Sequence, residues 1–220
     1  MKKLILISAI PMAIVFTSCS DVPKGDQAVI TETQSAASAK GQAFKVDTAN
    51  SRIRFTGNGV GKNHLGTFHL SSGSVALSDN QITGGLFTIN INSLQVEQQG
   101  TIFQSKLKPH LLSGDFFDAE KFGTAKFEIT KVEPYTTHGT DTSIVDGANF
   151  FISGNFTLKE DTKNITFPAK VDLDGETLKA KANFNIDRTQ WKMNYGNDKT
   201  LGDKFISETV NIELDLQAKK

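Results

Sequence analysis

Residues 107–127 decide the fold, and they read LKPHLLSGDFFDAEKFGTAKF. The leucines at the start of this stretch have the spacing of one helix face, and Ser113-Gly114 supplies a stop signal. A turn rich in Phe follows, and the apolar residues then alternate as they do in a strand. The stretch therefore predicts a short helix between two sets of strands, acting as a plug or lid on a β structure.

Alternating apolar and polar residues dominate the chain on both sides of this helix. Residues 165–173 keep one parity over five apolar positions, Asp174-Gly175 is a strong hairpin signal, and residues 178–186 alternate again. About eight or more such runs predict an all-β sandwich or barrel. Long strands with one apolar face favour an up-and-down antiparallel barrel, which leaves no exposed sheet edge. An eight-stranded barrel is just wide enough for its own side chains or one small ligand.

Charge and cysteine content narrow the function classes. The 24 Lys and Arg residues balance the 24 Asp and Glu residues, so no basic excess points to a nucleic-acid partner. Cys19 is the single cysteine, so no internal disulfide can form and an apolar core must hold the fold.

The N-terminus resembles a bacterial lipoprotein signal. A charged start is followed by an apolar run and by small residues that end at Cys19. We expect residues 1–18 to be cleaved and Cys19 to carry lipid, with a plain secretory signal as the alternative. Ser20 favours an outer-membrane lipoprotein, facing either the periplasm or the outside. Residues 19–42 are polar and aperiodic, which predicts a flexible tether before a barrel domain at 43–220.

Five motifs in order resemble those of the YceI-like family, and together they span residues 44 to about 218. They are residues 44–55, 64–68, 111–122, 154–158 and 183–191. The resemblance implies an extended, lipocalin-like antiparallel barrel whose interior can hold a long isoprenoid chain, such as a quinone or a prenyl phosphate.

The inward-facing residues of such a barrel would line its lumen. The candidates are Phe55, Phe68, Phe87, Ile89, Phe127, Ile152, Phe156, Phe167, Phe184 and Ile186. They could form an apolar ligand pocket, or they could be ordinary core; the alternation alone does not separate the two.

Four other residues are candidates for contact with a ligand's polar head group. Lys62 and His64 follow a glycine-rich turn at a barrel end, and Arg188 and Trp191 lie where a strand ends. For the latter pair a purely structural role is the competing interpretation, an Arg packed on an aromatic ring.

Signals for catalysis and metal binding are weak. His64 and His69 are five residues apart with no acidic residue or cysteine at ligand spacing, so we predict no metal. No nucleophile elbow or ordered triad stands out, so we predict a binding protein rather than an enzyme. The alternative is a structural or interaction lipoprotein with a filled barrel and no lipid ligand. The oligomeric state is left open.

Overall fold

The computed structural model describes residues 23–59, 62–97, 103–137 and 142–220. The expected signal peptide at 1–18 and the expected lipidation site Cys19 lie outside the described residues. Within the described residues, no helix is long and apolar enough to span a bilayer.

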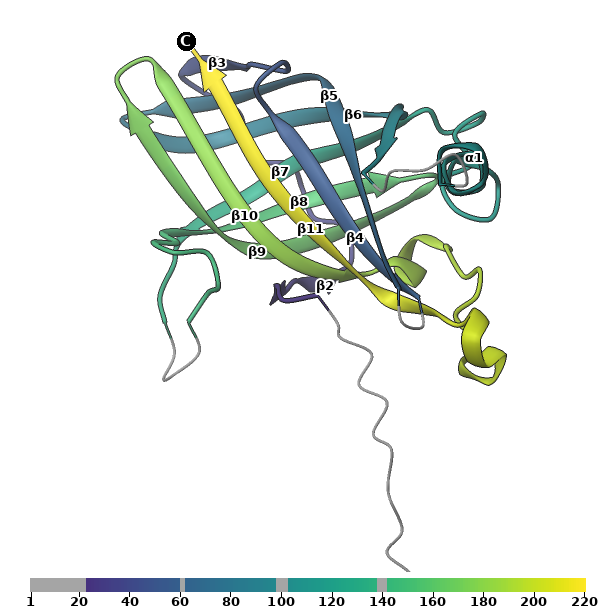
Figure 1. The fold of residues 1–220 in the computed structure, drawn as a ribbon. Coiled ribbons are helices and arrows are strands. Elements are labelled where there is room, and N and C mark those ends of the chain that lie inside the picture. The colour runs from purple at the N-terminus through teal and green to yellow at the C-terminus, as the bar shows by residue number, and fades with distance from the viewer. Residues whose placement is uncertain (1–22, 60–61, 98–102, 138–141) are drawn as a thin grey trace, which may run out of the picture.

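Eight strands of the described chain form a closed antiparallel barrel (Figure 1). They are β4 (Arg52–Gly59), β5 (Lys62–Ser78), β6 (Gln81–Val96), β7 (Thr124–Pro134), β8 (Phe150–Leu158), β9 (Asp161–Asp174), β10 (Thr177–Asp187) and β11 (Ile206–Lys219). Each strand pairs with the next, and β11 pairs with β4 to close the ring. The predicted all-β, eight-stranded antiparallel barrel with a short helix is confirmed.

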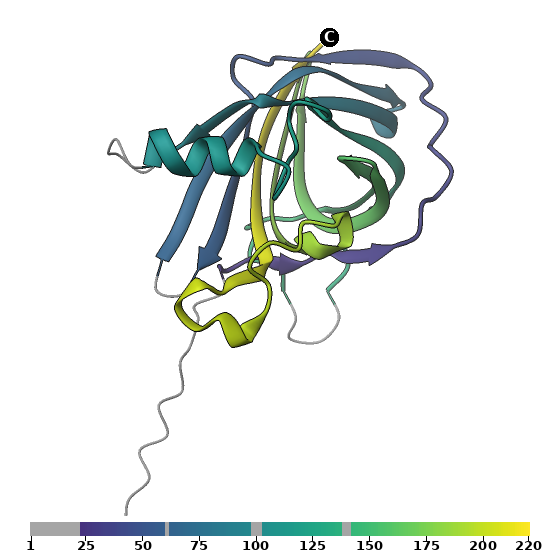
Figure 2. The same cartoon turned by 90° about the vertical axis from the view of Figure 1, so that its right-hand side faces the viewer.

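The two ends of the barrel differ. One end, here called the mouth, carries the connections from β4 to β5, β6 to β7, β8 to β9 and β10 to β11. The helices are on these connections: η1 (Phe103–Leu107) and α1 (Lys108–Leu112) after β6, then η2 (Arg188–Trp191) and η3 (Lys199–Lys204) after β10 (Figure 2). The other end, the base, carries the connections from β5 to β6, β7 to β8 and β9 to β10. It also carries β3 (Gln42–Val46), which pairs with β5 and β11. The helix of residues 107–112 therefore lies at one opening, as its sequence predicts.

The seam between β9 and β10 is only half closed. The two strands pair from the base as far as Lys181 opposite Lys170, and the ladder stops there. Continuing the same register would set Asn183 opposite Pro168, which has no N–H to donate. Toward the mouth, β9 and β10 do not pair with each other, so their facing backbone N–H and C=O groups can bond to another segment.

The N-terminal segment fills these edges. β1 (Asp26–Gln27) pairs in parallel with β10, and β2 (Val29–Thr31) pairs antiparallel with β9. Between them, Ala28 is buried and its N–H donates to the carbonyl of Asn185 at 3.0 Å. The segment then passes around the outside of the barrel to β3 at the base (Figure 2). We call residues 23–41 the strap.

The strap corrects the expectation of a flexible tether over residues 19–42. In the described part of that range, specific hydrogen bonds fix the chain to the barrel wall. Two cross-strand asparagine pairs, Asn185–Asn211 and Asn155–Asn164, lie buried beneath it. Their amides donate to the carbonyls of Pro23 at 3.1 Å, Lys24 at 3.4 Å and Gln34 at 2.7 Å. Backbone and amide bonds hold the strap, so its sequence shows no apolar period.

Candidate ligand-binding cavity

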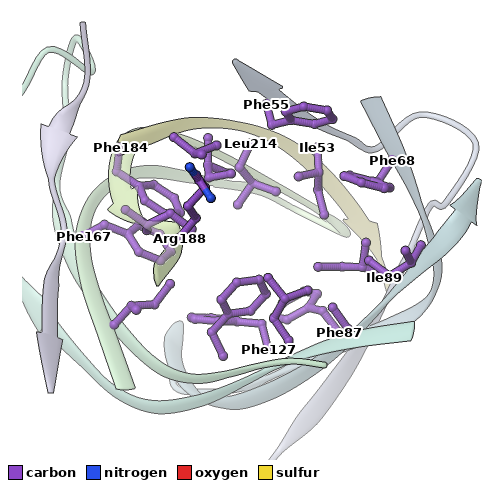
Figure 3. A pocket seen from close by; sticks show the side chains of 18 of the residues that line it. Ile53, Phe55, Phe68, Phe87, Ile89, Phe127, Phe167, Phe184, Arg188 and Leu214 are labelled. Carbon is purple, nitrogen blue, oxygen red and sulfur yellow. The ribbon is translucent and has the colours of Figure 1, made fainter. Parts of the chain in front are cut away.

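The barrel encloses an apolar cavity of about 420 Å³, within the usual range for small-molecule sites. Figure 3 shows side chains arranged around its wall with their ends directed inward. All ten residues predicted to face the lumen lie on this wall. Their placement follows from strand alternation; their contact with a ligand stays a prediction.

Aromatic rings follow the cavity wall. The rings of Phe167 and Phe184 stack at 4.0 Å between centroids, on the two strands that part at the seam. Phe127 continues the row, with its centroid 5.8 Å from Phe167 and 6.2 Å from Phe87. Because each ring packs against its neighbour along the wall, the centre of the barrel is left open (Figure 3).

Two glycines make room for rings against the wall. A Cβ on Gly154 would lie 2.3 Å from the ring of Phe127, and a Cβ on Gly66 would lie 2.5 Å from the ring of Phe55. Any other residue would push these rings toward the lumen. The glycines therefore help to keep the cavity empty of side chains.

The helical segment after β6 covers the mouth. Leu107, Leu111 and Phe116 line the cavity, and the ring of Phe117 lies 5.2 Å from that of Phe68. A second contact joins this segment to the connection between β10 and β11: His110 lies 4.7 Å from Tyr195 between ring centroids. The plug predicted from sequence is thus a lid that packs on the wall without filling the lumen.

Polar residues on the cavity wall gather at the mouth. They are Asn58, His64, His110, Arg188 and Ser207. A ligand with a long apolar chain and one polar end would therefore place its polar end at the mouth, under the lid.

The four predicted head-group residues divide into two that reach the cavity and two that do not. His64 and Arg188 are on the wall, whereas Lys62 and Trp191 are not among the lining residues. Trp191 is fully buried and donates from Nε1 to the carbonyl of Phe156 at 3.1 Å. This bond holds η2 against β8, which is a structural role for Trp191. The guanidinium of Arg188 lies 5.9 Å from the centroid of the Phe116 ring. Lys62 is exposed at the start of β5.

Arg188 has a structural role and also lies on the cavity wall, where a head group could contact it. Its guanidinium is buried and donates to the carbonyls of Ser207 at 2.9 Å, Tyr195 at 3.0 Å, Ile206 at 2.9 Å and Met193. Desolvation lowers the pKa of Arg188 from its usual value, while the negative charges of Glu208 and Asp187 oppose that shift. The arginine therefore fixes the connection between β10 and β11 and also brings positive charge to the cavity mouth (Figure 3).

His64 is also a partly buried residue of the cavity wall at the mouth. Burial lowers the pKa of its imidazole, and the neighbouring charge of Lys62 lowers it further. Near neutral pH the ring is therefore uncharged and suits a neutral polar partner or a hydrogen-bond acceptor better than a salt bridge.

Two residues at the mouth were not anticipated from sequence. His110 lines the cavity, and its Nε2 lies 3.0 Å from Asp115 Oδ2. Asn58 lies near the end of β4, and its side chain is buried at the cavity wall. The parity of β4 places Asn58 outside the Ile53–Phe55 register, so alternation gave no signal for it.

Within the described residues, no group of three or more His, Cys, Asp or Glu side chains could hold a metal ion. A second pocket of about 310 Å³ lies at the base and shares Ile82, Val171 and Leu178 with the main cavity. The space lined by apolar residues therefore extends along the barrel from mouth to base.

Comparison with known proteins gives a consistent result. The YceI-like domain family matches residues 44–218. A UPF0312 protein of Shewanella sp. strain ANA-3 is 27% identical over 184 residues, covering 82% of this chain and 87% of the relative.

Two crystal structures share the fold at low sequence identity. BcnA of Burkholderia cenocepacia has a TM-score of 0.62 at 20% identity, covering 79% of this chain and 99% of its own. A polyisoprenoid-binding domain from Saccharophagus degradans, implicated in plant cell wall breakdown, has a TM-score of 0.59 at 13% identity. That likeness covers 80% of this chain and 97% of the domain.

Proposed function

We propose that this chain, which belongs to the YceI-like family, binds an isoprenoid-type lipid in its barrel. It would sequester or carry that lipid in the cell envelope. The observation that carries the proposal is the open lumen, whose wall is almost wholly apolar. The polyisoprenoid-binding domain from Saccharophagus degradans, which shares the fold, supports the ligand class.

The physical basis is burial of the chain. Each methylene moved from water into the cavity contributes about 0.8 kcal/mol, so several isoprene units offset the cost of ordering the ligand. No covalent step is required, and we propose a binding protein rather than an enzyme. At the mouth, His64, His110 and Arg188 would meet the polar end of the lipid, whether a quinone ring or a prenyl phosphate.

We further propose that Cys19 carries the lipid anchor of an outer-membrane lipoprotein. The support is the N-terminal sequence, with its charged start, apolar run and single cysteine. The intact mass of the protein purified from membranes tests this, because acylation at Cys19 adds a defined mass to the cleaved chain. An unmodified thiol at Cys19 would contradict it.

Extraction tests lipid binding itself. The purified protein is extracted with organic solvent and the extract is analysed by mass spectrometry against a mock purification. We expect an isoprenoid lipid in near-equal molar amount with the protein. Repeated absence of lipid above the mock level would favour the alternative, a structural or interaction protein, although the cavity is not filled by side chains.

A further inference from the structure

Three of the five exposed large apolar residues of the described chain lie on elements of one side of the molecule. Val29 on the strap is 61% exposed, Ile144 in the β7–β8 connection is 49% exposed, and Leu201 in η3 is 42% exposed. The part of the strap that holds β1 and β2, the described part of the β7–β8 connection and η3 all lie along the lower side of the molecule in two perpendicular views (Figures 1 and 2). Isolated exposed apolar residues are ordinary, so the grouping depends on the three separate elements that bring these residues to one side. We call it the strap face.

The strap and the β7–β8 connection are held together. Asp26 accepts hydrogen bonds from Ser143 Oγ at 2.6 Å and from the N–H of Ile144 at 3.2 Å. Ser143 also accepts a bond from Val145, and its own N–H donates to the hydroxyl of Tyr135 at 2.7 Å. These hydrogen bonds fix the backbone at Ile144, so the exposure of its side chain is a property of the folded connection.

The strap face is also where the covalent anchor would enter. Pro23 and Lys24 are bound to the asparagine pair Asn185–Asn211, and Gly25 packs directly on it. Four peptide units separate Cys19 from Pro23. Whatever their conformation, Cys19 can therefore lie at most about 14 Å from Pro23. The lipid headgroup layer takes up about 6 Å of that reach. Because the strap is fastened along its length, no further slack is available.

We propose that the strap face lies against the phospholipid bilayer, so that the barrel rests on its side with the half-closed β9–β10 seam toward the membrane. The inference rests on the proposed lipid anchor at Cys19 and goes beyond lipid binding by the cavity. Charges are balanced on η3 and its N-cap residue, with Lys199 and Lys204 against Asp198 and Asp203. They are also balanced on the strap, with two lysines (Lys24, Lys40) against two acids (Asp26, Glu32). Apolar insertion rather than attraction to anionic lipid therefore sets the contact, and salt leaves it unchanged.

Site-specific quenching tests the orientation. Cys19 is the only cysteine and its sulfur is blocked when acylated, so one introduced cysteine takes a single fluorophore. We would label Val29→Cys, Ile144→Cys and Leu201→Cys in the full lipidated protein. The matched control is Leu86→Cys on β6, which is 45% exposed. The proteins are placed in phosphatidylethanolamine and phosphatidylglycerol vesicles that contain brominated lipid.

We expect quenching at positions 29, 144 and 201 to be several times that at position 86, at low and at high salt. Equal quenching at all four positions, with Cys19 blocked, would overturn the strap face as the membrane-facing side. Fluorophore on Cys19 in every variant would overturn the inference through its premise, the anchor. Neither result alters the extraction test, so a failure of lipid binding is distinguished from a failure of docking.

Discussion

The inner and outer faces of the barrel wall come from the same strands but use their side chains differently. On the inner face, rings such as Phe167 and Phe184 pack along the wall and leave an apolar space. On the outer face, amides such as Asn185 and Asn211 are buried as well, but beneath a strap that they bind by hydrogen bonds. Burial on one face thus creates room for a ligand, and burial on the other fixes the position of the N-terminal segment.

The largest effect should follow from filling the inner face. Leu214 points into the cavity (Figure 3), and Leu214→Trp would occupy the space of the ligand chain. We expect at least a tenfold loss of retained isoprenoid, corresponding to about 1.4 kcal/mol or more of binding free energy. The amount of lipid per protein after reloading is measured by mass spectrometry.

Leu86→Trp, on an exposed residue of β6, is the matched control and should leave retention unchanged. Denaturant unfolding of both variants shows whether overpacking rather than occlusion is responsible. Ile212→Phe is a milder second variant on the same wall. Normal retention in folded Leu214→Trp would mean that the lipid binds elsewhere.

Substitution of Arg188 tests how much this buried residue contributes to the stability of the barrel mouth. Arg188→Met would leave buried carbonyls without donors, and we expect the free energy of unfolding to fall by about 3 kcal/mol. Arg188→Lys should recover part of that loss, because an ammonium has fewer donors. Urea unfolding of the three proteins is the measurement. Unchanged stability combined with lost lipid retention would assign Arg188 to the head group alone.

The outer face is tested at one asparagine pair. Asn211→Ala removes the amide beneath Lys24, and we expect a loss of about 1–2 kcal/mol in unfolding free energy. Amide hydrogen exchange of residues 24–31 should accelerate while that of β6 does not. Gln95→Ala, on an exposed β6 residue, is the control. Unchanged exchange in the strap would show that other bonds hold it.

The smallest effect concerns pH. Burial lowers the pKa of His64 below its usual 6.5, so the unfolded chain binds the proton more readily than the folded chain. Stability should therefore fall as the pH drops from about 6.5 toward the folded-state pKa, and rise again with pH. His64→Gln should flatten this part of the curve in urea unfolding at a series of pH values. An identical slope in the variant would assign it to other groups.

Prediction from sequence succeeded where one periodicity governs a long segment. The strand runs keep a regular alternation, so the all-β class and the inward direction of the ten predicted residues follow from parity. The choice of a barrel over a sandwich also needed the strand lengths and the family resemblance. The lid followed from a local change in spacing near Leu111. The strap could not be predicted in the same way, because amide and backbone bonds hold it and neither leaves a periodic pattern. Asn155 and Asn185 alternate exactly as water-facing residues would, and only the folded chain reveals what covers them.

The mouth was partly predictable for a similar reason. His64 and Arg188 could be placed near a barrel end from the strand limits. His110 could not be placed in this way, because the orientation of a short helix depends on its contacts. Here those contacts are with Tyr195, far along the chain, and with Phe116, in the following turn. Whether the lumen is open was also beyond alternation, because it depends on how the rings pack against one another.

Native mass spectrometry of the delipidated protein, titrated with an isoprenoid quinone, tests the central claim most directly. The open apolar lumen predicts a single lipid bound per chain, and no adduct on the cavity-filling variant Leu214→Trp. Several weak adducts that appear equally on both proteins would contradict a lumen site, and so would no adduct on either.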